Sequence, residues 1–271
     1  MEPINYTLIT GASEGFGKAL ALECASRKMN LVLVALPGPE IHYLARFIEK
    51  NFEVTVVGFE YDLSIEANCF KLFEEVKAQQ LSIRYLINNA GMLSRAMFCD
   101  LEPEYFLNQI RLNVSAPTLL ISLFMPDLKQ NSPSAILNVS SMASFFYLPQ
   151  KQVYGGTKSY LLSFSQSLRR ELKGDGISVS VVCPGGMNTT PKLIFQNRIG
   201  SWGSRQSIMD PEDVAKISIK AMLNGKSLII PGGVNYLFIL LNRLLPRFIK
   251  EKITEIHCKK QFIKVRERIT A

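Results

Sequence analysis

Residues 10–17 read TGASEGFG and stand between a short apolar run and a segment with helical apolar spacing. Three glycines, Gly11, Gly15 and Gly17, give this stretch a GxxxGxG spacing. Glycine lets the backbone turn sharply and approach a phosphate closely, and the start of the following helix offers free N–H groups to an anion. The stretch therefore predicts a strand–loop–helix unit that binds a dinucleotide. The alternative is a glycine-rich turn that holds no ligand.

Short runs rich in Val, Ile and Leu recur along the whole chain. They lie at 6–9, 31–35, 54–58, 83–87, 135–139, 177–182 and 227–230. Most of them do not alternate with polar residues, which is typical of strands covered on both faces. Six helical segments are expected between them, among them 16–29, 65–79, 103–124, 153–173 and 211–223. This order predicts an α/β protein with a doubly wound, seven-stranded parallel sheet, the Rossmann fold.

Length and composition exclude several classes of protein. The chain has 271 residues, of which 47% are hydrophobic and 20% charged, so it can bury a substantial core and is not disordered. Five scattered cysteines, no CxxC and only two histidines argue against disulfides and against a zinc site, and we expect no metal. Single cysteines and the lack of a secretory leader suit a cytoplasmic protein.

The net charge of +8 is concentrated near the end of the chain. Residues 236–271 contain nine Lys or Arg and three Glu, which leaves the preceding part nearly neutral. That part has no basic stripe with interleaved aromatics, so no nucleic acid is expected as a partner. No linker divides the chain, and we expect a Rossmann-fold domain over 1–233 and a basic amphipathic helical extension over 234–271.

A YxxxK motif occurs twice, as Tyr147/Lys151 and as Tyr154/Lys158. Each tyrosine has a serine thirteen residues before it, so this spacing does not separate the two copies. Pro149 makes a continuous helical turn awkward in the first copy. The second copy begins a helical segment, in which residues i and i+4 share a face. The second copy is therefore the favoured candidate.

Two further spacings occur with the second copy and not with the first. Its serine, Ser141, has an asparagine 28 residues before it, Asn113, whereas the position that corresponds in the first copy is Phe106. A Pro-Gly pair also begins 30 residues after Tyr154, at Pro184. The family resemblance described next implies that Asn113, Ser141, Tyr154 and Lys158 act together.

Four motifs follow one another along the chain: TGASEGFG, NNAG at 88–91, the second YxxxK and PGGMNT at 184–189. In this order they resemble the motifs of the short-chain dehydrogenase/reductase family, and the resemblance covers about residues 4–232. The resemblance implies hydride transfer between NAD(P)(H) and a ketone or secondary alcohol, which would make residues 1–233 the catalytic domain. It also implies a small-molecule substrate and a homo-oligomer, built through the helices at 103–128 and 153–173.

The expected chemistry explains the residue types. Reducing a ketone adds a hydride to carbon and a proton to oxygen, and a free tyrosine has a pKa near ~10, too high for efficient exchange at neutral pH. The ammonium of Lys158 would lower the pKa of Tyr154, and Ser141 would hydrogen-bond the carbonyl oxygen. The resemblance implies that Asn113 supports the lysine through a water molecule.

Other interpretations of the same residues stay open at this point. Ser141 could cap a turn, with Ser140 as the functional neighbour. Asn113 could be a buried residue at a helix kink, and Lys158 a solvated helix residue.

The resemblance also implies which residues bind the cofactor. These are Thr10, Gly11, Ser13, Gly15, Phe16, Gly17, Asp62, Leu63, Asn89, Ala90, Gly91, Tyr154, Lys158, Pro184, Gly185 and Thr189. The alternative for Asp62 is a helix N-cap. An acidic residue after the second strand would bind the ribose 2′-hydroxyl of NAD, and an arginine there would bind the 2′-phosphate of NADP. This chain has Leu36 at that position, so neither interaction is available. NADP(H) is slightly preferred over NAD(H), although Glu14 would repel a 2′-phosphate.

An apolar segment, about 190–208, follows the Pro-Gly pair and would cover the substrate, unless it simply packs as a surface helix. Its apolar members are Leu193, Ile194, Phe195, Ile199 and Trp202, and Phe145, Phe146 and Tyr147 could line the same pocket. An acyl or lipid-like substrate is expected. In this respect the chain is similar to long-chain 3-oxoacyl reductases and 3-ketosphinganine reductases.

Apolar residues recur at helical spacing over 236–249. A helix of that length spans only ~21 Å, short of the ~30 Å of a bilayer core, so a membrane span is not expected. The extension is either an interfacial helix on anionic headgroups, which would make the protein membrane-peripheral, or a helix docked on the body or on a partner subunit.

Two other functions fit a fold of this kind. One is a dinucleotide sensor or membrane-peripheral module without catalysis, which would be free to lose a member of the Asn/Ser/Tyr/Lys set. The other is epimerisation or dehydration, which leaves no net change in the nicotinamide.

Overall fold

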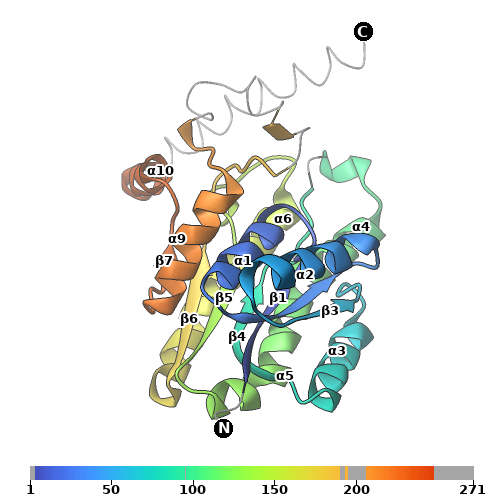
Figure 1. Ribbon diagram of the computed structural model, residues 1–271. Helices are drawn as coiled ribbons and strands as arrows, with labels where there is room; N and C mark the ends of the chain where they lie inside the picture. Colours follow the sequence, from blue (N-terminus) through green and yellow to red (C-terminus); the bar gives the residue numbers. More distant parts are fainter. Residues whose placement is uncertain (1–3, 95, 190–192, 195–205, 247–271) are drawn as a thin grey trace.

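The computed structural model describes residues 4–94, 96–189, 193–194 and 206–246. Its centre is a seven-stranded sheet with the order β3-β2-β1-β4-β5-β6-β7, in which every neighbouring pair is parallel (Figure 1). The strands are β1 (Asn5–Thr10), β2 (Asn30–Ala35), β3 (Val56–Glu60), β4 (Ser82–Asn88), β5 (Ser134–Val139), β6 (Ile177–Val182) and β7 (Leu228–Ile229). The predicted doubly wound parallel sheet is confirmed.

Helices cover both faces of this sheet and enclose two apolar cores. One core lies under α1 (Gly15–Ser26), α2 (Pro39–Phe52) and α9 (Pro211–Leu223), and the other under α3 (Glu66–Ala78), α5 (Ala116–Gln130) and α6 (Gln152–Glu171). The first six strands are buried on both sides because each contributes residues to both cores. This explains why their sequences are apolar without alternation.

Two elements differ from the ranges expected from sequence. The third strand is Val56–Glu60 rather than 54–58, because α2 ends at Phe52 and Glu53 adopts a left-handed conformation (φ 54°). The chain then needs two residues to reach the sheet. The long helix expected at 103–124 is divided into α4 (Pro103–Ile110), a π-helical turn (Arg111–Ser115) and α5.

The strand order places a crevice at the carboxyl ends of β1 and β4. The chain leaves β1 toward β2 on one side and enters β4 on the other, so the loops after these two strands diverge. Ligands of doubly wound sheets bind at such a switch point. The glycine loop follows β1, and NNAG closes β4, so both motifs lie at this crevice.

The last described helix is α10 (Gly233–Leu244), which contacts the short turn Met142–Phe145 after β5. The division of the chain at 233/234 stays a prediction. Within the described ranges, no helix has the length and apolar character required to cross a bilayer. Four cysteines of the described part, Cys24, Cys69, Cys99 and Cys183, are free thiols, and Cys258 lies outside it.

Candidate active site

The three glycines of the loop after β1 meet two different steric demands. Gly11 and Gly15 have φ angles of 64° and 53°, in the left-handed region that side chains avoid. Gly17 is in an ordinary helix, but a Cβ there would overlap the carbonyl oxygen of Gly11. The absence of a side chain thus lets the first turn of α1 lie directly on the loop.

Hydrogen bonds from the end of β4 hold this loop in place. The hydroxyl of Thr10 accepts from the backbone N–H groups of Asn89 and Ala90, both at 3.0 Å. The side-chain amide of Asn89 donates to the carbonyl oxygens of Thr10 and Gly11, again at 3.0 Å. Thr10, expected at the cofactor, is buried and does not line the cleft described next, so it fixes the loop from behind.

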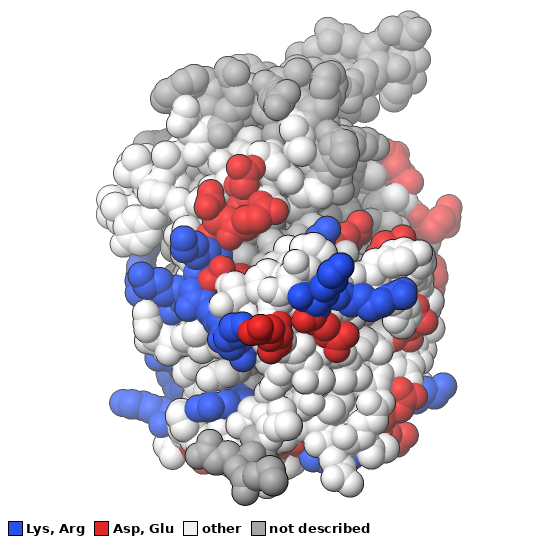
Figure 2. Space-filling model, viewed as in Figure 1, with Lys and Arg blue, Asp and Glu red and all other residues white. Residues whose placement is uncertain are grey.

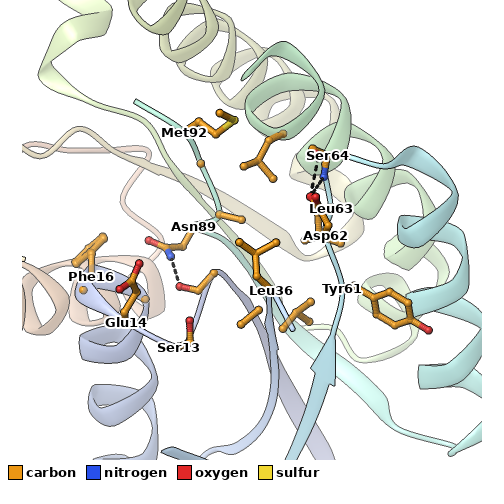
Figure 3. A pocket seen from close by; sticks show the side chains of 18 of the residues that line it. Ser13, Glu14, Phe16, Leu36, Tyr61, Asp62, Leu63, Ser64, Asn89 and Met92 are labelled. Atoms are coloured by element: carbon orange, nitrogen blue, oxygen red, sulfur yellow. Dashed lines mark hydrogen bonds between the residues drawn. The ribbon is translucent and has the colours of Figure 1, made fainter. Parts of the chain in front are cut away.

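A cleft of about 570 Å³ lies over the glycine loop. Figure 3 shows Ser13, Glu14 and Phe16 on one side of it, Asp62, Leu63 and Ser64 on the other, and Leu36 between them. Helix α1 begins without a side-chain cap and without an acid in its first turn, so its N–H groups stay available to an anion. These features fit the diphosphate of a dinucleotide.

Two carboxylates fix the backbone of segments that adjoin the cleft. The Asp62 carboxylate accepts from the N–H (2.9 Å) and the hydroxyl (2.7 Å) of Ser64, so it closes a turn before α3 rather than capping that helix. The Glu60 carboxylate accepts from the N–H of Gly38 at 3.0 Å, which holds its pKa below the ordinary range. Sequence reasoning missed Glu60, although an acid at the end of the third strand was visible.

Tyr154 and Lys158 lie one turn apart on α6, with the lysine Nζ 5.8 Å from the centre of the tyrosine ring. Both line a cavity of about 160 Å³, which shares Phe16, Asn89 and Gly91 with the dinucleotide cleft. Tyr147, in the first YxxxK, precedes the helix and is 90% exposed. Of the two tyrosines, the structure thus brings Tyr154 to the crevice and leaves Tyr147 in solvent, whereas Lys151 of the first copy lines a neighbouring cavity.

Lys158 is 4% exposed, so it is not a solvated helix residue. Its Nζ donates to the carbonyl oxygen of Val139, at the end of β5, at a distance of 2.8 Å. Burial lowers the pKa of its ammonium from 10.5 to about 8. At neutral pH the group therefore still carries its proton, but it loses that proton far more readily than a surface lysine.

Asn113 occupies the π-helical turn between α4 and α5 and is fully buried. Its carboxamide oxygen accepts from the N–H of Met92 at 2.8 Å. The amide nitrogen donates at 3.0 Å to the carbonyl oxygen of Met92 and to the hydroxyl of Thr157. Asn113 is thus both the kink residue and a link to the turn between Tyr154 and Lys158. Thr157 was not predicted, because a threonine inside YxxxK carries no signal by itself.

The two neighbouring serines have different environments. The hydroxyl of Ser140 is buried and donates to the carbonyl oxygen of Lys158 at 2.7 Å, so it ties β5 to α6. The hydroxyl of Ser141 accepts from the N–H of Ala143 at 3.1 Å and caps a short turn. Ser141 also lines the cavity with Tyr154, so here the cap and the cavity residue are the same serine.

A third cavity, of about 290 Å³, continues from Ser141 and Tyr154 toward α10. Its apolar lining includes Met142, Phe146, Leu148, Met187, Leu193 and Phe238. Phe146 and Leu193 are thus at the pocket, whereas Tyr147 is exposed to solvent. Of the proposed cover, Phe195, Ile199 and Trp202 lie outside the described residues.

The remaining predicted cofactor residues lie along the same crevice. The cavity with Tyr154 is lined by Pro184 and Gly185. The dinucleotide cleft is lined by the others: Gly11, Ser13, Gly15, Phe16, Gly17, Asp62, Leu63, Asn89, Ala90, Gly91 and Thr189. A Cβ at Gly91 would lie 3.2 Å from the Nζ of Lys158, so the lack of a side chain there also matters.

Comparison with known proteins relates the chain to dehydrogenases of this architecture. The NADP-dependent 3-hydroxy acid dehydrogenase of Schizosaccharomyces pombe is 28% identical over 246 residues, 85% of this chain and 95% of that protein. The very-long-chain 3-oxoacyl-CoA reductase of Mus musculus is 30% identical over 191 residues, 66% of this chain. The matched part spans only 58% of that reductase.

Solved structures share the fold over nearly the whole chain. A short-chain dehydrogenase from Sphingobium yanoikuyae, in complex with NADPH, has a TM-score of 0.75 and 26% identity, and the match covers 90% of this chain and 97% of that one. The model of the short chain dehydrogenase family matches residues 5–195, more than half of the sequence. The chain therefore belongs to the short chain dehydrogenase family, a family of NAD(P)-dependent oxidoreductases.

Proposed function

We propose that this protein interconverts a ketone and a secondary alcohol with NAD(P)(H), using Tyr154 as general acid and base. The observation that carries the proposal is one small cavity lined by Ser141, Tyr154 and Lys158. It shares residues with the dinucleotide cleft on one side and with the apolar pocket on the other. A carbonyl group in this cavity would therefore have the cofactor on one side and room for its substituents on the other.

The chain's own residues supply the proton chemistry. The Lys158 ammonium, held beside Tyr154, favours the phenolate and so eases release of the proton from the tyrosine hydroxyl. Ser141 would donate to the carbonyl oxygen and stabilise the negative charge that develops on it. The side-chain amide of Asn113 donates to the Met92 carbonyl oxygen and to the Thr157 hydroxyl. These bonds fix the turn of α6 that carries Tyr154 and Lys158.

The cofactor would be held along the crevice, with its diphosphate at the start of α1 and its nicotinamide near Pro184, Gly185 and Thr189. Bound there, the nicotinamide supplies or accepts the hydride. We propose a small preference for NADP(H), because Leu36 replaces the acid that would bind a ribose 2′-hydroxyl. The S. pombe and Sphingobium relatives, NADP-dependent and NADPH-bound, support this preference, while Glu14 opposes it.

An apolar, acyl or lipid-like substrate is proposed for the same site. The support is the apolar lining of the third cavity, together with the similarity to a 3-oxoacyl-CoA reductase. We also propose that copies of the chain associate through α5 and α6, that the protein works in the cytoplasm, and that its C-terminal extension contacts a membrane.

The test of this function is cofactor titration, NADPH beside NADH, followed by turnover of medium- and long-chain 3-oxoacyl thioesters. Tyr154→Phe should lower kcat by about 10²- to 10⁴-fold while the dinucleotide still binds, because only the proton transfer is lost. Tyr147→Phe is the matched control, since it removes the hydroxyl of the first YxxxK, and it should leave kcat unchanged.

Three results would contradict the proposal in different ways. An equal loss of kcat in Tyr154→Phe and Tyr147→Phe would contradict the assignment of Tyr154 as the general acid and base. Dinucleotide binding without turnover of any ketone would favour the sensor, and product without net nicotinamide oxidation would favour epimerisation or dehydration. If neither dinucleotide binds, the assignment of the glycine loop is wrong.

A further inference from the structure

Two asparagines lie on the side of helix α10 that packs on the body. Asn235 is 1% exposed, and its amide donates to the carbonyl oxygens of Pro231 (2.8 Å) and Ser207 (3.2 Å). The side-chain amide of Asn242, two turns further on, donates to the carbonyl oxygen of Phe145 at 2.9 Å. Both asparagines therefore fix the helix against the wall of the substrate pocket.

The opposite side of α10 is apolar and exposed. It carries Tyr236, Leu237, Leu240, Leu241 and Leu244, of which the last is 72% exposed. A surface helix ordinarily turns its apolar side inward and its polar side to water, whereas α10 leaves this row of apolar residues exposed. Figure 2 shows uncharged residues over α10 in this view. A continuous apolar patch of this kind marks an interaction surface.

The charges that follow this helix favour a lipid surface as its partner. Beyond Leu244 the sequence carries eight Lys or Arg and only three Glu, and Arg243 lies in the last turn of α10. An apolar helix face next to an excess of cations is typical of helices that lie on anionic membranes. A symmetric contact between two copies of α10 would instead bring two basic segments together.

We propose that the exposed face of α10 docks on an anionic lipid bilayer and that the substrate pocket opens beside that contact. Phe238 and Asn235 of α10 line the pocket that also contains Ser141 and Tyr154. An apolar substrate dissolved in the bilayer would then reach the site without crossing water. The docking surface stands independently of catalysis, whereas the entry of substrate rests on the proposed function.

The test uses the full chain and sedimentation with phosphatidylcholine vesicles, with and without phosphatidylglycerol. The variant replaces Leu240, Leu241 and Leu244 by Gln, which removes apolar area without adding charge. It should bind phosphatidylglycerol vesicles at least about tenfold more weakly than wild type. The matched control replaces three exposed aromatic residues elsewhere, Tyr43, Phe47 and Phe70, by Gln and should bind as wild type does.

A second measurement compares a long-chain 3-oxoacyl thioester placed in the vesicles with a short-chain one in water. The leucine variant should lose turnover of the first and keep turnover of the second. Dinucleotide binding at wild-type affinity shows that the variant is folded.

Two results would overturn the lipid proposal: wild-type vesicle binding by the leucine variant, or no vesicle binding by the wild type. A change of subunit number in the leucine variant would show that a second copy covers the face. If vesicle binding behaves as expected and no ketone is turned over, the docking surface stands and the proposed function fails.

Discussion

The two ends of the crevice are built in different ways. At the dinucleotide end the backbone itself forms the surface: Gly11, Gly15 and Gly17 allow close packing, and Thr10 and Asn89 fix the loop through four hydrogen bonds. At the substrate end the surface consists of side chains from separate parts of the chain, and the two asparagines of α10 tie that helix to the rest.

This difference has a physical consequence. A backbone surface tolerates almost no added atoms, so its requirements appear in the sequence as glycines at fixed spacings. A side-chain surface can be rebuilt with many residue types, so it can be adapted to a new substrate without leaving a motif. The two ends should therefore respond to substitution in different ways.

The largest effect is expected for Gly17→Ala, at the dinucleotide end. The new Cβ would overlap the Gly11 carbonyl oxygen, so the loop or α1 must move. Dinucleotide affinity should fall about a hundredfold, as measured by fluorescence titration.

Gly156→Ala is the matched control, because Gly156 is also a helical glycine but a Cβ added there would meet no neighbouring atom within 4 Å. It should bind dinucleotide normally and raise the free energy of unfolding by about 0.5–1 kcal/mol. Equal affinities of the two variants would show that the glycine loop is not a close-packed surface.

The next prediction concerns Lys158, where the two ends meet. Because the pKa of its ammonium is about 8 in the fold and 10.5 when unperturbed, only the unfolded chain keeps this proton between those pH values. Stability must therefore rise with pH across this window, by about 2 kcal/mol from about pH 8 to about pH 10.

The measurement is urea unfolding of the wild type and of Lys158→Met at several pH values. The difference between the two proteins reports Lys158 together with its coupling to the Cys183 thiol, whose pKa the lysine lowers. The buried Cys24 thiol, whose raised pKa acts in the opposite direction, is common to both proteins. A difference that does not vary with pH would mean that the lysine is not buried as described.

A smaller effect is expected for Asn89→Ala, which removes the two side-chain hydrogen bonds to the glycine loop. Since each typical hydrogen bond contributes about 0.5–1.5 kcal/mol, dinucleotide affinity should fall about tenfold. The KM for the ketone, measured at saturating dinucleotide, should stay unchanged. A change confined to the ketone KM would contradict the separation of the two ends.

The smallest effect is expected for Asn242→Ala, at the substrate end. Loss of the single bond to the Phe145 carbonyl oxygen should raise the KM for a long-chain ketone severalfold and leave dinucleotide affinity unchanged. Steady-state kinetics with short- and long-chain substrates would measure this. A reduced dinucleotide affinity would show that α10 supports the whole crevice and not only the pocket.

Much of the fold followed from sequence because the signals are local. Apolar runs without alternation predicted all seven strands, and the glycine spacing predicted the turn between β1 and α1. Pro149 and the spacing to Asn113 distinguished Tyr154 from Tyr147, and in the structure only Tyr154 lines the crevice. Each of these inferences depends on a few neighbouring residues or on a fixed distance along the chain.

The rest was decided by contacts between distant segments. No local pattern indicates that Ser140 binds the Lys158 carbonyl oxygen, that Thr157 meets Asn113, or that Glu60 holds the loop after β2. The orientation of α10 is the clearest case. Its apolar spacing predicts a helix but not which side faces the body. In the structure, Asn235 and Asn242 lie on that side and bind the carbonyl oxygens of Ser207 and Phe145. Sequence determines which residues can share a face, whereas tertiary structure decides what that face meets, because the partners lie far away in the chain.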